Sequence, residues 1–206
     1  MILRDKKELI WVLVISTLIM SWGSVPTWMG YKLETRDLRF RGLYFDSQDY
    51  AAHVAMMEAG IHGEWTYQFR FTTESFNPAY VRIFYIFLGH FSRFSTISPE
   101  VVYHLARWLL GFAALYTLYG LTRQIFQKIF WARTAFLLAA LGSGLGWLQL
   151  IFNLTSSRIT PIDFWLIDSY VFFSLSIFPH FAFVTAAMCI TLSLWLNYLE
   201  NPNRKS

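Results

Sequence analysis

The chain has 206 residues, of which 55% are hydrophobic, 19% aromatic and 15% charged. Soluble domains contain about 25% charged residues, so this composition excludes a disordered chain and disfavours a water-soluble globule. A single cysteine, Cys189, excludes a disulfide scaffold, and a net charge of +4 without a run of basic residues gives no reason to expect nucleic acid as a partner.

Four segments are long and apolar enough to cross a bilayer, which takes about 20 mainly apolar residues. The first lies in an uncharged stretch from Leu9 to Tyr31, too long for the core of a signal peptide. The second is preceded by Ser98, Pro99 and Glu100, residue types that favour a helix N-terminus. We place the spans near 9–29, 100–121, 134–153 and 177–198.

The basic residues predict the orientation of these spans. With four spans, three segments face the same side, and they carry Arg4, Lys6, Lys7, Arg123, Lys128, Arg133, Arg204 and Lys205. Basic residues favour the cytoplasmic side, so both termini are expected to be cytoplasmic and loops 30–99 and 154–176 external. The sequence therefore predicts an all-α polytopic membrane protein with a single membrane domain over residues 1–206.

The long external loop is expected to carry two helices near the membrane surface. One runs over 48–59, capped by Ser47 and stopped by Gly60. The other lies near 78–94, where only about ten central residues are free of charge. Such a length fits an interfacial or re-entrant helix better than a span.

Two acidic residues begin the first of these helices. Asp46 and Asp49 can hold a cation or act as a base, and His53 lies one turn after Asp49. The alternative is that both carboxylates only favour the helix N-terminus through its dipole.

Ionisable residues also lie in and near the later spans, where they are costly and often functional. Asp163 and Asp168 lie in the second external loop, and the alternative for them is ordinary solvation. His180 is a candidate metal ligand or proton shuttle, or else a satisfied core histidine. Arg107 can pair with a carboxylate, grip a lipid phosphate or form a structural ion pair.

Glycines at 142, 144 and 146 lie within the third expected span. They lack the lysine of a phosphate-binding loop, so we expect them to serve close helix packing.

Several features follow one another in a fixed order: Phe45-Asp46-Ser47, Asn77-Pro78 leading to an apolar helix that ends Leu88-Gly89, Arg107, Gly144-Leu145-Gly146-Trp147, the pair Asp163 and Asp168, and Phe178-Pro179-His180-Phe181. This order resembles the N-terminal portion of the GT-C class of polytopic membrane glycosyltransferases. The class includes the protein O-mannosyltransferases, the aminoarabinose transferase of lipid A and the catalytic subunit of oligosaccharyltransferase. The resemblance covers nearly the whole chain but only about the first four spans of a class member.

The resemblance implies an inverting transfer of a sugar from a polyprenyl-phosphate donor on the extracytoplasmic side of a membrane, here expected to be a bacterial inner membrane. Asp46, with Asp49, would activate the acceptor. Arg107 would hold the donor phosphate together with Asp163 and Asp168 of the acidic second loop, and His180 and His53 would be ligands of a divalent metal. The chain would then be a truncated form, one part of a split protein whose second chain supplies the missing spans, or a degenerate relative.

Two other classes of protein share this composition. A non-catalytic membrane scaffold or fragment that binds a lipid or a partner subunit is the main alternative. A small transporter ranks last, because the two halves show no matching broken segments.

Overall fold

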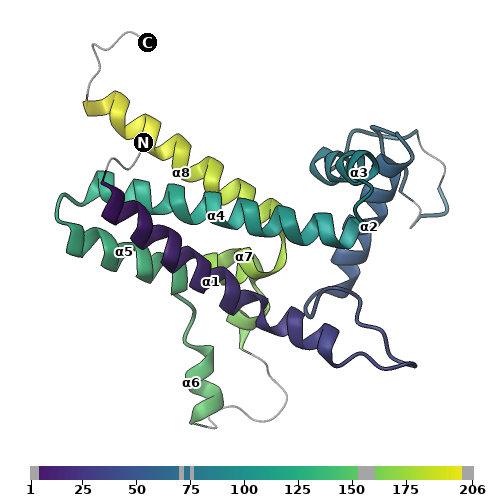
Figure 1. The fold of residues 1–206 in the computed structure, drawn as a ribbon, viewed down its shortest axis with the longest axis horizontal. Coiled ribbons are helices and arrows are strands. Elements are labelled where there is room, and N and C mark those ends of the chain that lie inside the picture. The colour runs from purple at the N-terminus through teal and green to yellow at the C-terminus, as the bar shows by residue number, and fades with distance from the viewer. Residues whose placement is uncertain (1–4, 70–71, 75–76, 153–160, 201–206) are drawn as a thin grey trace. The chain divides into compact units, whose positions relative to one another are not determined.

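The computed structural model describes residues 5–69, 72–74, 77–152 and 161–200. The helices are α1 (Lys6–Lys32), α2 (Ser47–Ile61), α3 (Ile83–Ser95), α4 (Pro99–Ile125), α5 (Ile129–Leu141), α6 (Gly146–Ile151), α7 (Val171–Ile177) and α8 (Pro179–Glu200), with 3-10 turns η1 (Ile162–Phe164) and η2 (Ile167–Ser169) (Figure 1). Among the described residues, the one pairing of extended backbone is the isolated bridge between Tyr67 and Ala79. The all-α prediction is confirmed.

Among the described residues, three helices, α1, α4 and α8, are long and apolar enough to cross a membrane. They have 27, 27 and 22 residues, so they extend about 40, 40 and 33 Å, against a hydrocarbon core of about 30 Å. Each leaves large apolar side chains exposed, among them Leu18, Leu109 and Leu194. Such side chains are stable when lipid surrounds them, and the chain is therefore a membrane-embedded protein.

The expected third span, 134–153, is not one continuous helix. Helix α5 ends at Leu141, and α6 covers Gly146–Ile151. The 13 residues of α5 extend about 20 Å, too short to cross the bilayer alone. The described residues thus contain three candidate spans and one broken apolar segment, where four spans were predicted. Residue 153 and residues 154–160 of the second expected loop lie outside the described residues.

The chain divides into two compact units. Unit 1 comprises residues 1–24 and 107–206, and its core is built from α1, α4, α5, α7 and α8. Trp11, Tyr119 and Phe136 form an aromatic cluster there, with ring centres 5.3 to 5.8 Å apart. Four alanines of the core allow close helix contact: Ala114, Ala140, Ala182 and Ala186.

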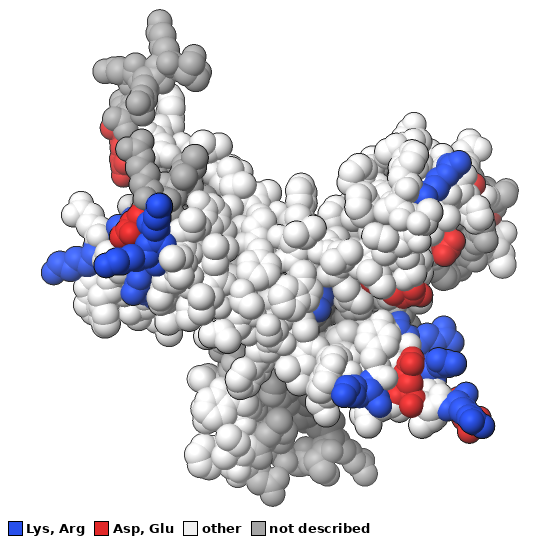
Figure 2. All heavy atoms as spheres, in the orientation of Figure 1, with Lys and Arg blue, Asp and Glu red and all other residues white. Residues whose placement is uncertain are grey.

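The helix ends that were predicted to be cytoplasmic meet at one end of unit 1. The contacts are the Arg123–Glu8 ion pair at 3.0 Å, the Arg133 guanidinium 4.5 Å from the Trp11 ring centre, and a 3.1 Å hydrogen bond from Gln124 Nε2 to Asn197 Oδ1. In Figure 2, charged side chains gather at this end, and the middle of the unit 1 helices is largely uncharged. The predicted basic residues Arg4, Arg204 and Lys205 lie outside the described residues.

Unit 2, Val25–Ala106, is organised around the pair α2 and α3. Their backbones approach closely, because a Cβ atom at Gly60 would meet the Ile86 carbonyl, and one at Gly89 would meet the Met57 carbonyl. Helix α3 begins at Ile83 rather than near residue 78, since Ala79 is extended and bonded to Tyr67. The two loop helices that the sequence predicts are therefore packed against each other.

Candidate functional site

The first acidic pair lies at the start of α2 in unit 2. Asp46, not Ser47, is the N-cap residue, with a left-handed backbone (φ 48°). Its carboxylate accepts a 3.3 Å hydrogen bond from the backbone N–H of Asp49. Both carboxylates are exposed. Asp46 thus stabilises the helix N-terminus while remaining open to solvent.

His53 lies one turn further along α2 and is fully buried. Its Nε2 lies 2.7 Å from Arg82 Nη1, and its ring stacks on Tyr85 with centres 4.0 Å apart. An arginine can only donate, so Nε2 is the acceptor and the imidazole is the neutral Nδ1–H tautomer. The lone pair of Nε2, which a metal ion would need, therefore accepts a hydrogen bond from Arg82. Arg82 was not among the predicted site residues, because nothing local links it to a histidine 29 positions away.

Tyr50 is a buried polar group next to the acidic pair. Its side chain is 4% exposed, and its hydroxyl has no hydrogen-bond partner among the described residues. Burial, followed by the nearby Tyr31 and Glu100, raises the pKa of Tyr50 well above its ordinary value of 10.0. The structure identifies Tyr50 as a buried, neutral phenol one turn after Asp46.

Asp163 lies in unit 1 beside the break between α5 and α6. It accepts a 2.6 Å hydrogen bond from the backbone N–H of Gly146, the first residue of α6. A Cβ atom at Gly144 or at Gly146 would meet this carboxylate. Gly144 and Gly146 leave room for a carboxylate at a helix break, where close packing between helices was expected, and a Cβ atom at Gly142 would meet the Leu138 carbonyl of α5.

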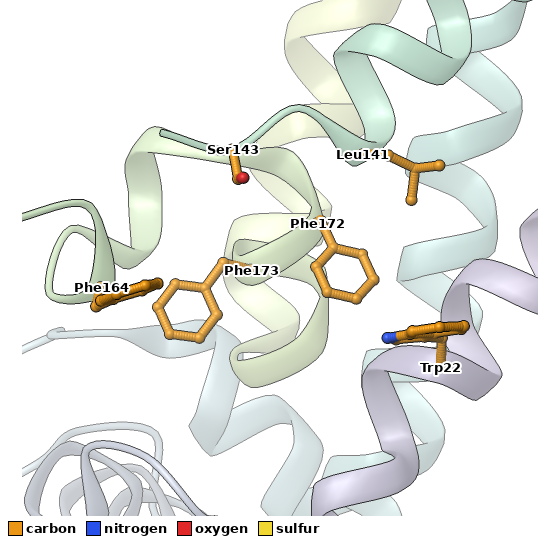
Figure 3. A pocket seen from close by; sticks show the side chains of 6 residues that line it. All are labelled: Trp22, Leu141, Ser143, Phe164, Phe172 and Phe173. Carbon is orange, nitrogen blue, oxygen red and sulfur yellow. The ribbon is translucent and has the colours of Figure 1, made fainter. Parts of the chain in front are cut away.

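An apolar pocket of about 550 Å³ opens beside this break in unit 1. Its lining residues are Trp22, Leu141, Ser143, Phe164, Phe172 and Phe173 (Figure 3). They come from α1, the end of α5, the segment after it, η1 and α7. The Ser143 hydroxyl and the Trp22 indole N–H are the polar side-chain groups of this lining. Sequence reasoning missed the pocket, because aromatic residues are common throughout the chain and give no local signal.

Arg107 is 1% exposed and holds three helices of unit 1 together. From α4 it donates from Nη1 to the Ser176 carbonyl at 3.1 Å and from Nη2 to the Ser24 hydroxyl at 2.9 Å. Ser176 lies in the last turn of α7, where helix carbonyls lack partners within the helix. These partners are a hydroxyl and a carbonyl, and they give Arg107 a structural role.

The remaining candidates, Asp168 and His180, do not form a metal centre. Asp168 is exposed in η2, and His180 lies in the first turn of α8 with its ring 4.3 Å from that of Phe181. Within the described ranges, no group of three His, Cys, Asp or Glu side chains could hold a metal. The predicted residues divide between the units: Asp46, Asp49 and His53 in unit 2, and Arg107, Asp163, Asp168 and His180 in unit 1.

Comparison with known proteins found no matching family model, no matching curated protein and no matching solved structure. The membrane-embedded helical fold is therefore established from this chain alone, and the resemblance to the GT-C class stays a prediction.

Proposed function

We propose that the chain is a membrane-embedded glycosyltransferase module that transfers a sugar from a polyprenyl-phosphate donor to an acceptor on the extracytoplasmic side. The observation that carries this proposal is the apolar pocket of unit 1, which is lined by four aromatic side chains and Leu141. Its volume of about 550 Å³ lies within the range of small-ligand sites. Unit 1 holds all of α8 and most of α1 and α4, so the occupant best suited to the pocket is a hydrocarbon chain.

In this proposal, Asp46 is the general base. A hydroxyl acceptor is a weak nucleophile, so a carboxylate that takes its proton speeds the attack. The acceptor oxygen bonds to the anomeric carbon, the bond from that carbon to the donor phosphate breaks, and the phosphate leaves with the electron pair. The exposed carboxylates of Asp46 and Asp49, on the same turn of α2, support this role because a water-borne acceptor can reach them.

The second candidate function is a non-catalytic subunit that binds a lipid or a partner. One observation favours it: Asp46 and Asp163 each accept a hydrogen bond that stabilises a helix start. A binding protein needs the pocket but not a base, so these structural roles would then be the whole reason for the two carboxylates.

The substitution Asp46→Asn separates the two functions. Asparagine tolerates a left-handed backbone and caps helices, so α2 should keep its start, but an amide cannot act as the base. In membranes that contain the remaining components and a radiolabelled polyprenyl-phosphate sugar, we expect transfer to fall about 100-fold or more.

The matched control is Glu58→Gln, which removes another exposed carboxylate from α2 itself and should leave transfer unchanged. Full transfer by Asp46→Asn would remove Asp46 from catalysis. Crosslinking of a polyprenyl probe to the wild-type chain with no transfer in any preparation would favour the binding subunit.

A further inference from the structure

A basic segment follows directly on the first candidate span and has no part in the proposed catalysis. Its cationic residues are Lys32, Arg36, Arg39 and Arg41, and all four are exposed. In Figure 2, blue spheres gather over the end of α1 and the loop after it, with red between them. The preference of basic residues for the cytoplasmic side does not extend to a loop as long as 30–99, so that preference does not account for this cluster. The cluster therefore needs a reason of its own.

The segment has a defined conformation that returns to the helix. Phe40 packs edge-on against Tyr31 of α1, with ring centres 4.9 Å apart. The backbone N–H of Phe40 donates to Glu34 Oε1 at 3.0 Å. A turn is closed by a 3.0 Å hydrogen bond from the Thr35 N–H to the Leu38 carbonyl. The loop is thus folded back on the last turn of α1, which keeps its charges near the end of the span.

The same segment exposes apolar side chains. Trp28 is 59% exposed, Leu33 72% and Leu38 71%. The Lys32 ammonium lies 4.7 Å from the ring centre of Trp28. Tryptophan at the end of a span favours the level of the lipid headgroups, and a lysine beside it can reach the phosphates. The apolar and basic groups together therefore suit the boundary between hydrocarbon and headgroups.

The acidic side chains of the segment do not neutralise it. Glu34 is engaged twice, by the Phe40 N–H and by Arg39, whose Nη1 lies 3.7 Å from Glu34 Oε2. Glu34 and Arg39 balance each other's charge. Asp37 is the one remaining carboxylate of the segment, and it faces three remaining positive charges, those of Lys32, Arg36 and Arg41. An excess of positive charge remains, and it complements a phosphate-bearing lipid surface.

We infer that residues 28–41 form a binding surface for anionic phospholipid headgroups of the bilayer that α1 enters. The surface combines exposed Trp28, Leu33 and Leu38 with the excess basic charge. It is independent of sugar transfer and would serve either proposed function, by fixing the depth of the first span.

A local reporter tests this inference. The full chain with Cys189→Ser carries Leu38→Cys, labelled with bimane, in nanodiscs that contain brominated phosphatidylglycerol or brominated phosphatidylcholine. Bromine quenches only nearby fluorophores. We expect phosphatidylglycerol to quench about fivefold more strongly per lipid, and the difference to shrink at high salt.

In the triple variant Lys32→Gln, Arg36→Gln, Arg41→Gln, the two brominated lipids should quench the bimane fluorescence equally. The matched control, Lys6→Gln, Lys7→Gln, Lys128→Gln, removes three exposed charges of unit 1 and should keep the preference. Equal quenching in the unsubstituted chain, or a preference that survives the first triple substitution, would overturn the inference. Neither result bears on Asp46, because the assay contains no sugar donor.

Discussion

Asp163 accepts a 2.6 Å hydrogen bond from the backbone N–H of Gly146, seventeen positions earlier in the chain. The carboxylate lies where a side chain at Gly144 or Gly146 would otherwise be. The bond satisfies the first N–H of α6 at the point where the apolar segment is interrupted. One long-range contact thus supports a helix start beside the pocket.

Asp163→Ala should destabilise unit 1, because it removes a hydrogen bond to a charged acceptor worth about 1.5–3 kcal/mol. Asp163→Asn keeps an oxygen that can accept the hydrogen bond, so it should lose less stability than Asp163→Ala. The melting temperatures of the two variants in the same detergent measure the difference. Equal melting of both variants and the wild-type chain would show that the contact contributes nothing to stability.

Arg107→Met should destabilise unit 1 by about 3 kcal/mol or more, because the Ser176 carbonyl and the Ser24 hydroxyl would lose their donor inside the protein. Arg107→Lys supplies one ammonium in place of a two-armed guanidinium and should fall between Met and wild type. Thermal unfolding ranks the three proteins. A lysine variant as stable as wild type would show that the two-armed geometry is unnecessary.

Tyr50→Phe should be at least as stable as the wild-type chain at neutral pH, because a buried hydroxyl without a described partner costs about 1–3 kcal/mol. Above pH 10.0 the stability advantage of Tyr50→Phe over the wild-type chain should grow. The folded pKa of Tyr50 is raised, so the unfolded chain loses the phenol proton at a lower pH than the folded chain does. The wild-type chain therefore loses stability as the pH rises above 10.0, and Tyr50→Phe does not undergo this loss.

Unfolding midpoints of wild type and Tyr50→Phe between pH 8 and about 11 measure this linkage. Tyr80→Phe, which removes a hydroxyl from a 73% exposed side chain, serves as the control and should follow the wild-type curve. Parallel curves for wild type and Tyr50→Phe would contradict a raised pKa.

Gly89→Ala should disrupt unit 2, because the added methyl group would meet the backbone carbonyl of Met57. A backbone clash is not relieved by a side-chain rotation, and we expect a loss of about 2 kcal/mol or more. Phe91→Ala on the same helix, where the side chain is 50% exposed, should cost less. Limited proteolysis within residues 25–106 compares the variants, and equal resistance would refute the close helix contact.

The predicted orientation is tested by impermeant thiol labelling in intact cells. Glu64→Cys lies in the loop expected outside, and Gln127→Cys lies between α4 and α5 at the end expected inside; both positions are exposed. We expect reagent to label only position 64 before the cells are opened. Labelling at position 127 in intact cells would reverse the orientation and place the α4–α5 turn outside.

The long spans and the loop helices were determined by the sequence itself. Helices α1, α4 and α8 follow from unbroken apolar stretches, and the start of α4 follows from Ser98, Pro99 and Glu100. These signals are local, because hydropathy and capping depend on neighbouring residues. The same locality explains why α2 was predicted to within two residues at its C-terminal end.

The tertiary structure alone decided the partners of the ionisable residues and the position of the pocket. Arg82 lies 29 positions from His53, and Arg107 lies 69 positions from Ser176. Hydropathy in the third apolar segment favours a continuous helix, whereas the glycines and the distant Asp163 carboxylate interrupt it. Contacts of this kind depend on which helix faces meet, and a local pattern of residues does not contain that information.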